Sequence, residues 1–455
     1  MRASFGQIKA VFALIVLHHF AVGLFAQGER REDESDQKQR YAIIQTAELI
    51  RHGYGLDSAY RYLESERVRK ALENATWRES YYKKSTSASE VTALDLSFMG
   101  LTTIPDFVYE YENLKTLNLS FNKISALPRD LKRLKHLKQI NLAGNGLDTN
   151  AFRSARLTQI EKLNLSWNNL CELPRRAKKL RNVATITMDY NRLTEVPRRL
   201  KKFRLLEEIS LSANNLMHFG KHLRYLKRLD QLTQLDLRSS NINKVPDEIR
   251  YLNRLKRLDL SNNQIFLVSP QIGELDSLLE LSLHNNQLET IPAELYECQE
   301  LLSLTLQKNK LRRLPNGISQ LQNILSLFLQ YNQLEYLPDD IGDMNVEEIY
   351  VYHNKLTSLP ASFENLSKLR HLRINHTYIS EFPPQLLSLD LLESIDFTDS
   401  DITVLPPEIL DLKGLMLLSF REARIDFFDP RNRDYDLVMK QLYDRGVKLS
   451  IIDYE

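Results

Sequence analysis

Several absences limit what this chain can be. Only two cysteines, Cys171 and Cys298, occur among 455 residues, which excludes a disulfide framework. Hydrophobic residues make up 43% of the chain and charged residues 26%, which excludes a disordered protein and a polytopic membrane protein. After residue 26, no apolar stretch reaches the roughly 20 residues that a membrane-spanning helix needs.

Sequence signatures of catalysis are also missing. The chain has no P-loop, no dinucleotide-binding fingerprint, no Gly-x-Ser-x-Gly elbow and no zinc-protease motif. His218 and His222 have a spacing seen among metal ligands on helices, but no third ligand accompanies them, and Lys221 and Arg224 repel a cation. We therefore predict a protein that is not an enzyme, with no catalytic residues, no metal site and no cofactor.

The beginning of the chain has the pattern of a secretory signal peptide. Arg2 and Lys9 supply positive charge around the start of a largely apolar stretch from Val11 to Ala26. This stretch is shorter than a spanning helix, and the small Ala26 suits a cleavage site. We predict a cleaved signal peptide over residues 1–26, with an uncleaved membrane anchor as the alternative.

The next segment differs from the rest of the chain because it contains no proline; the first proline is Pro105. Residues 27–40 are dense in charge and offer no core residues, so we predict disorder there. Residues 41–90 place apolar side chains such as Ile43 and Ala47 at helical spacing. We predict a helical N-terminal cap over residues 41–90.

From Val91 the sequence repeats itself, mostly every 23 residues. One unit reads Leu114-x-x-Leu117-x-Leu119-x-x-Asn122-x-Ile124-x-x-Leu127-Pro128. Two spacings differ: 26 residues after position 206 and 22 after position 324. The fifteen units begin at residues 91, 114, 137, 160, 183, 206, 232, 255, 278, 301, 324, 346, 369, 392 and 415.

The residues of one unit explain its structure. Leu117 and Leu119 alternate with Asn118, as a half-buried strand requires. Leu131 and Leu134 return apolar side chains to the same core at helical spacing. A single unit cannot bury these leucines alone, whereas stacked units can. The sequence therefore predicts an α/β solenoid with a parallel inner sheet and about 15 repeats.

The repeat resembles the leucine-rich repeat family, whose units of about 20–29 residues carry L-x-x-L-x-L-x-x-N-x-L. The Leu-Pro-x-x-Ile variant is similar to secreted bacterial proteins and to plant intracellular Ras-group-related repeat proteins. The resemblance covers residues 91–430 and implies a horseshoe in which asparagines bridge backbone groups of the turns. Asn122, Asn145, Asn168, Asn191, Asn214, Asn263, Asn286, Asn309, Asn332 and Asn354 occupy the asparagine position, and other units have Met99, Ser240, Thr377, Ser400 and Ala423 there.

The repeat register is lost after Pro430, and residues 431–455 are expected to form a C-terminal cap. Leu437, Val438 and Leu442 favour a helix that Gly446 ends, and a short strand is expected after it. Such a cap shields the last open face of the core.

The residues between the leucines of each strand face the inner side of the horseshoe. Early units show small polar residues there, whereas Phe328, Tyr350 and Arg373 occupy one position in three successive units. Tyr352 and His371 lie two residues along their strands from this column. Strands stack about 4.8 Å apart, so these side chains are expected to touch. Aromatic residues and arginine are typical of binding surfaces, and a stacked ladder that only stiffens the sheet is the alternative.

Large rings also share a position that borders the turn after the strand. Trp167 and Tyr190 occupy it, with Phe98 and Phe121 earlier and Tyr331 later. We predict that these rings pack against their neighbours.

Charge is unevenly distributed although the net charge is only +2. Residues 123–228 hold 24 Lys and Arg against 8 Asp and Glu, a net of +16, whereas residues 331–455 hold 12 against 23, a net of −11. Stacking would align many of the cations in a basic stripe on the outer, convex side that could bind a polyanion; a solvated face is the alternative. The stripe comprises Arg129, Lys132, Arg133, Arg175, Arg176, Lys178, Lys179, Arg198, Arg199, Lys201 and Lys202.

These observations predict a binding protein with a protein or peptide ligand on the inner surface. We expect export, either by secretion or to the periplasm or cell envelope of a bacterium; membrane anchoring or a cytoplasmic adaptor is the alternative. An anionic envelope surface is the partner expected for the basic stripe, and the leader argues against nucleic acid. The basic front and acidic rear also favour head-to-tail self-association.

Overall fold

The structure is a computed structural model, and it describes residues 88–153, 157–176, 180–421, 423–426 and 428–450. The predicted signal peptide over 1–26 and the predicted disordered segment over 27–40 lie outside the described residues. So does nearly all of the N-terminal cap predicted over 41–90.

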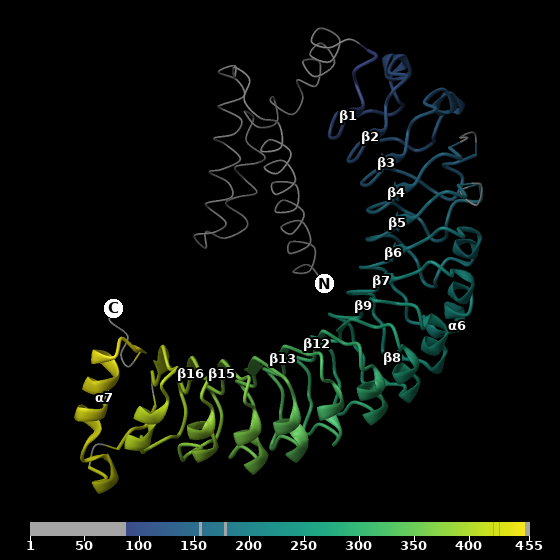
Figure 1. Ribbon diagram of the computed structural model, residues 1–455. Helices are drawn as coiled ribbons and strands as arrows, with labels where there is room; N and C mark the ends of the chain where they lie inside the picture. The colour runs from purple at the N-terminus through teal and green to yellow at the C-terminus, as the bar shows by residue number, and fades with distance from the viewer. Residues whose placement is uncertain (1–87, 154–156, 177–179, 422, 427, 451–455) are drawn as a thin grey trace, which may run out of the picture.

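The repeat units form one curved solenoid with its strands on the inner side of the arc (Figure 1). All neighbouring strands pair in parallel, and each residue faces the same repeat position of the next unit, as Leu94 faces Leu117. This confirms the predicted repeat solenoid with a parallel inner sheet, which has 16 strands among the described residues. Its strands are β1 (Ala93–Asp95), β2 (Thr116–Asn118), β3 (Gln139–Asn141), β4 (Lys162–Asn164), β5 (Thr185–Thr187), β6 (Glu208–Ser210), β7 (Gln234–Asp236), β9 (Arg257–Asp259), β11 (Glu280–Ser282), β12 (Ser303–Thr305), β13 (Ser326–Phe328), β14 (Glu348–Tyr350), β15 (His371–Arg373), β16 (Ser394–Asp396), β17 (Leu417–Ser419) and β18 (Lys448–Ser450).

The outer side of the arc consists mainly of 3₁₀ helices. Prolines at the shared repeat position precede most of them in extended conformation, as Pro128 does with φ −73° and ψ 159°. A tight 3₁₀ turn returns the chain within the short unit. The 3₁₀ helices are η1 (Asp106–Glu110), η2 (Arg129–Arg133), η4 (Arg198–Lys202), η5 (Leu226–Arg228), η6 (Asp247–Leu252), η7 (Pro270–Glu274), η8 (Ala293–Glu297), η9 (Ile318–Gln320), η10 (Asp339–Asp343), η11 (Ala361–Asn365), η12 (Pro384–Ser388), η13 (Pro407–Asp411) and η14 (Pro430–Asn432).

Three further kinds of element complete the described chain. The lengthened unit after residue 206 contains the short helix α6 (Gly220–Leu223). A separate two-stranded parallel sheet joins β8 (Lys244–Val245) to β10 (Leu267–Val268). The helix expected near the C-terminus is α7 (Tyr435–Asp444), followed by Gly446 at φ +85° and by strand β18.

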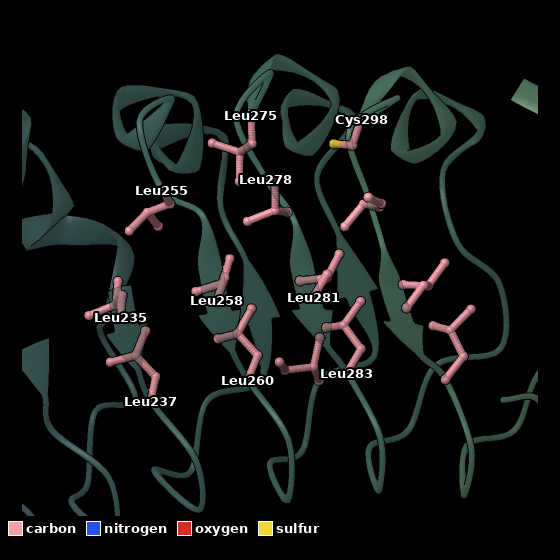
Figure 2. Packing of buried hydrophobic residues seen from close by; sticks show 14 of the residues in the cluster. Leu235, Leu237, Leu255, Leu258, Leu260, Leu275, Leu278, Leu281, Leu283 and Cys298 are labelled. Carbon is pink, nitrogen blue, oxygen red and sulfur yellow. The ribbon is translucent and has the colours of Figure 1, made fainter. Parts of the chain in front are cut away.

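The leucines of successive units stack into one continuous core between the sheet and the outer helices. Figure 2 shows this packing, in which equivalent leucines such as Leu235, Leu258 and Leu281 lie side by side. Cys298 is fully buried in the same core, at the repeat position of Leu275, where burial raises the pKa of its thiol to about 12. Both cysteines are free.

An asparagine in most units joins the turn of its own unit to the turn of the preceding unit. The side-chain amide of Asn286 donates to the carbonyl of Leu283 at 2.9 Å and to that of Leu260, in the preceding unit, at 3.0 Å. Its Oδ1 accepts the backbone N–H of Ile265 at 2.9 Å. Because these backbone groups are buried, leaving them unpaired would cost free energy of folding, and the hydrogen bonds of the ladder avoid that cost.

Units without the asparagine satisfy fewer of these groups. The Ser240 hydroxyl donates to the carbonyls of Leu211 and Arg238, and the Thr377 hydroxyl donates to that of Ile374. Ser240, Thr377 and Ser400 are all buried. Each therefore occupies the position of the ladder asparagine with a shorter side chain. The ladder is therefore least complete in the last units.

The C-terminal elements cover the end of the core. Val438, Met439 and Leu442 of α7 are buried in the same apolar cluster as the repeat leucines, and β18 pairs with β17. Asn432 donates to the carbonyl of Thr403 and accepts the N–H of Leu405, so it acts for the last turn as the ladder asparagines do for the others. These contacts agree with a capping role.

We predict that Asn286→Ala lowers the free energy of unfolding by at least about 2 kcal/mol, because one buried N–H and two buried carbonyls lose their partner. Guanidinium-induced unfolding measures the change. Gln287→Ala is the matched control, since Gln287 is exposed in the adjacent position. Equal losses in the two variants would show that the ladder adds nothing to stability.

Candidate ligand-binding surface

Strand pairing brings three of the predicted site residues into one row on the inner sheet. Phe328 of β13 faces Tyr350 of β14, which faces Arg373 of β15. The rings of Phe328 and Tyr350 are stacked, with centroids 5.1 Å apart and planes inclined by 8°. The guanidinium carbon of Arg373 lies 5.6 Å from the centroid of the Tyr350 ring. The contact expected from the repeat register is therefore present.

A carboxylate orients the central ring of this row. The hydroxyl of Tyr350 donates to Oε2 of Glu348 at 3.1 Å, and the hydroxyl of Ser326 donates to the same oxygen at 2.8 Å. Burial, and then the neighbouring Glu348 carboxylate, raises the pKa of Tyr350. The phenol therefore stays neutral at physiological pH.

The other two predicted residues lie beside this row. His371 faces Glu348 and Ser394 across the sheet, so it borders the stacked rings without joining them. Tyr352 lies two residues beyond Tyr350, where its ring meets the edge of the Tyr331 ring at 5.4 Å and an angle of 76°. All five predicted residues thus lie on one surface, and Tyr352 connects it to a second set of rings.

This second set was not assigned to the site from the sequence. The rings of Tyr331 and His353 are stacked at 4.4 Å, and those of His353 and His376 at 4.0 Å. The row continues to Lys308, whose ammonium lies 5.7 Å from the Tyr331 ring, and to Asp399, whose carboxylate lies 2.6 Å from Nδ1 of His376. We name Lys308, Tyr331, His353, His376 and Asp399 the turn row.

The turn row follows from the backbone of the turn after each strand. Its members have left-handed φ values, from 49° at Asp399 to 58° at Tyr331, which ordinary residues rarely adopt. Stacked Phe98–Phe121 and Trp167–Tyr190 pairs occur at the same repeat position, which confirms that these rings pack against one another. The signal in the sequence was the shared position, one residue before the ladder asparagine.

Between the two rows of rings lie side-chain amides with unused oxygens. Oε1 of Gln307, Oε1 of Gln330 and Oδ1 of Asn375 are buried without a hydrogen-bond partner among the described residues. They share one repeat position with Tyr352, which stands between Gln330 and Asn375 in the stack. An unpaired buried acceptor costs free energy, so a hydrogen bond from a ligand or a water molecule to one of these oxygens is favourable.

Polar groups earlier on the inner face are satisfied internally. Asp236 accepts two hydrogen bonds from the guanidinium of Arg238, which also lies 3.4 Å from Asp259. Asp189 accepts from the Ser210 hydroxyl at 2.5 Å and from the backbone of Ser212, while burial raises the pKa of this carboxyl. Unpartnered amides and paired rings therefore coincide only over β12–β16 within the described inner face.

The predicted basic stripe lies on exposed parts of the outer side. Arg129, Lys132, Arg133, Arg175, Arg176, Arg198 and Lys202 are exposed, whereas Lys178 and Lys179 lie outside the described residues. Arg199 is instead half-buried: it pairs with Glu172 at 2.8 Å and donates to the carbonyl of Leu173. Lys201 is also partly buried and lies over the Tyr225 ring.

Other sites are not evident in the part of the chain that the structure describes. No group of three or more His, Cys, Asp or Glu side chains there is arranged to hold a metal ion. Within the same ranges, every helix is too short or too polar to cross a bilayer.

Comparison with known proteins agrees with the repeat pattern. Two leucine-rich repeat families match residues 89–147 and 254–275. A leucine-rich repeat protein of Leptospira interrogans is 26% identical with a TM-score of 0.67, over 82% of this chain and 98% of that one. No curated protein sequence matches the chain.

Two further solved structures are similar. The leucine-rich repeat ectodomain of the Arabidopsis thaliana receptor kinase GASSHO1/SCHENGEN3, in complex with Casparian strip integrity factor 2, is 26% identical with a TM-score of 0.51. That match covers 70% of this chain and 43% of the ectodomain chain. An internalin from Listeria monocytogenes shares the fold at 15% identity and a TM-score of 0.54, over 84% of this chain and 95% of that one.

The parallel sheet, the asparagine ladder and the outer 3₁₀ helices define a repeat solenoid with a preformed inner surface. With the matches above, they show that this chain is a leucine-rich repeat protein.

The stacked histidines generate a pH-dependent prediction. Burial and then the adjacent His376 lower the pKa of His353, so the unfolded chain takes up this proton more readily than the folded protein. Stability therefore falls as the pH drops through the ordinary imidazole pKa of 6.5. We predict that His353→Asn reduces the loss of stability between about pH 7.5 and about pH 5.5.

Denaturant unfolding at both pH values measures this difference. Asparagine suits the position because Asn262 and Asn285 adopt the same left-handed conformation in other units. His284, whose pKa burial also lowers, is present in both proteins and cancels in the comparison. An unchanged pH dependence in the variant would contradict the prediction.

Proposed function

We propose that this protein is a non-enzymatic binding protein that holds a protein or peptide ligand on the inner surface over β12–β16. The observation that carries the proposal is the coincidence, on this one surface, of two rows of rings and of buried amide oxygens without partners. The residues assigned to ligand contact are Phe328, Tyr350, Tyr352, His371 and Arg373, joined by Tyr331 and Gln330.

The chemistry of this surface suits a polypeptide. Tyr and Arg are the side chains that most often dominate protein interfaces, because they bury large areas and keep a polar end. Side-chain amides both donate and accept hydrogen bonds, as the backbone of a peptide does. A ligand segment lying across β13–β15 would therefore meet rings for its side chains and amides for its main chain.

The rigidity of the sheet favours binding. Every strand of the inner sheet from β2 to β17 is hydrogen-bonded on both sides, so the surface exists before the ligand arrives. Little ordering entropy then opposes association. The Arabidopsis ectodomain, solved with its bound factor, supports the same class of ligand for a similar solenoid.

We further propose that the protein acts outside the cytoplasm, by secretion or in a bacterial periplasm or cell envelope. The signal-peptide pattern of residues 1–26 supports this location. Mass spectrometry of natively expressed, fractionated protein tests it, and a mature chain that begins near Gln27 is expected. An intact Met1 in the membrane would support an anchored protein, and an intact Met1 in the cytosol would support an intracellular adaptor.

We predict that Tyr350→Ala with Tyr352→Ala weakens ligand binding by at least about tenfold, because each removes a ring from the centre of the surface. Random peptides displayed on phage are selected on the full chain. Enriched peptides are then synthesised, and their dissociation constants are measured for both proteins by biolayer interferometry.

The matched control is Tyr336→Ala with Tyr378→Ala, two tyrosines that are 50% and 59% exposed and lie beyond the strands of the inner sheet. This control is expected to bind like the unaltered protein, and circular dichroism checks that all variants fold. Peptides that bind the Tyr350 and Tyr352 variant with undiminished affinity would place the ligand elsewhere.

A second candidate function concerns the basic stripe. Its exposed cations favour an anionic envelope surface as partner, and the acidic rear of a second copy is another anion that the stripe could meet. We predict that replacing Arg175, Arg176, Arg198 and Lys202 together by Glu abolishes binding to phosphatidylglycerol vesicles at low salt. Rising salt should release the unaltered protein, because exposed charges are screened.

Vesicle co-sedimentation measures this binding, and sedimentation velocity of the protein alone reports head-to-tail self-association under the same salt conditions. The control replaces four other cations, Lys310, Arg312, Arg313 and Lys355, by Glu. It changes the net charge by the same amount as the stripe variant but leaves the stripe intact. If this control loses vesicle binding as fully as the stripe variant, net charge explains the effect and the stripe has no specific role.

A further inference from the structure

The one lengthened unit builds a local structure that the other units lack. Its 26 residues make room for α6 and then η5, which lie on the outer side before the chain returns to β7. Tyr225 follows α6, and Tyr251 lies in η6 of the next unit. These two tyrosines organise the cations around them.

Each tyrosine ring makes cation–π contacts with side chains from two successive units. Lys201 lies 5.0 Å and Arg224 5.3 Å from the centre of the Tyr225 ring. Lys227 lies 4.6 Å and Arg250 5.4 Å from the centre of the Tyr251 ring. Attraction to the faces of the rings brings these positive groups together in spite of their mutual repulsion.

The cations nearest Tyr251 are held by neutral groups. Arg250 donates from Nη1 to Oε1 of Gln271 at 3.0 Å, and Arg254 donates from Nη1 to the backbone carbonyl of Asp230 at 2.8 Å. The ion pairs found among the described residues do not involve Lys227, Arg250 or Arg254. Their charge is therefore positioned without a direct ion pair, although the carboxylates of Glu274 and Asp247 lie near enough to act on Arg250.

These cations line a pocket of about 410 Å³ between η5, η6 and η7. The volume falls within the range of sites for small ligands, about 300–1,000 Å³. Its polar lining consists of Lys227, Asp230, Arg250, Tyr251, Asn253, Arg254 and Glu274. The pocket thus has a cationic group of three side chains together with two carboxylates and an amide.

This mixture of groups selects among anions. Two guanidinium groups and an ammonium match the oxygens of a phosphate, which guanidinium binds in bidentate fashion. Asp230 and Glu274 repel a ligand that is negative throughout, but they accept hydrogen bonds from hydroxyl groups, as the Asn253 carbonyl does. A ligand with a phosphate at one end and hydroxyls at the other satisfies both parts.

We propose that this pocket binds a phosphorylated sugar, with the phosphate on Lys227, Arg250 and Arg254 and the sugar hydroxyls toward Asp230, Asn253 and Glu274. The site is separate from the inner surface and does not depend on the ligand bound there. The same group can be free in solution or form the headgroup of a glycolipid, and the two sources present the same chemistry to the pocket.

Isothermal titration calorimetry of the full chain with glucosamine 1-phosphate tests the proposal. Saturable binding is expected, at least about tenfold tighter than that of glucosamine or inorganic phosphate alone. Arg250→Gln with Arg254→Gln is expected to weaken it by at least about tenfold, because two charge-assisted contacts are lost. Arg312→Gln with Arg313→Gln, which removes two exposed arginines elsewhere, is expected to bind like the unaltered protein.

Vesicles that carry a phosphorylated glucosamine headgroup form the second arm. Binding of the soluble sugar phosphate identifies a free ligand, whereas binding only of the vesicles, lost in the Arg250 and Arg254 variant, identifies the lipid-borne group. Three results would overturn the proposal: no saturable binding in either arm, inorganic phosphate binding as tightly as the sugar phosphate, or equal binding by the two double variants. Circular dichroism confirms that each variant folds.

Discussion

The asparagine ladder is the interaction on which the rest of this structure depends. Each unit leaves the inner sheet through a turn whose backbone groups are buried against the next unit, where water cannot reach them. One side chain, such as Asn286, satisfies groups in its own turn and in the preceding one. Because a buried polar group without a partner is costly, the ladder sets the stacking of neighbouring units as well as their stability. The alignment of side chains across the inner sheet follows from that stacking.

The same turn explains the candidate binding surface. The residue before the ladder asparagine is left-handed in nearly every described unit, which is unfavourable for a large side chain. Here the strained backbone lines up the rings of Tyr331, His353 and His376, and their stacking offsets part of its cost. Parallel pairing aligns Phe328 and Tyr350 a few residues away. A surface suited to a ligand therefore arises from constraints that the solenoid must meet in any case.

The pairing of polar groups distinguishes the parts of the surface that only stabilise the fold from the parts that are suited to bind a ligand. Over β7 and β9, Asp236, Arg238 and Asp259 satisfy one another, so that part of the inner face has little to offer a partner. Over β13–β15 the amides of Gln330 and Asn375 keep unused oxygens beside rings that are only partly buried. On the outer side, Lys201 and Lys227 lie over the rings of Tyr225 and Tyr251, and Arg254 donates to the backbone carbonyl of Asp230. Both candidate sites are therefore places where polar or charged groups lack a hydrogen-bond partner or an ion pair among the described residues.

The sequence by itself determined the solenoid, its core, its ladder and the row from Phe328 to Arg373. Each of these depends only on residue types at a fixed spacing and on contacts between adjacent units, so the register was sufficient. It also showed the repeat position that the turn row shares, but it did not determine the left-handed turn that brings Lys308, Tyr331 and His353 together, because that backbone conformation is invisible in the hydrophobic pattern. Nor did it determine the pocket beside Tyr251, which depends on how the extra residues of one unit lie against the next. Those features were decided by tertiary structure, since they rest on backbone conformation and side-chain direction.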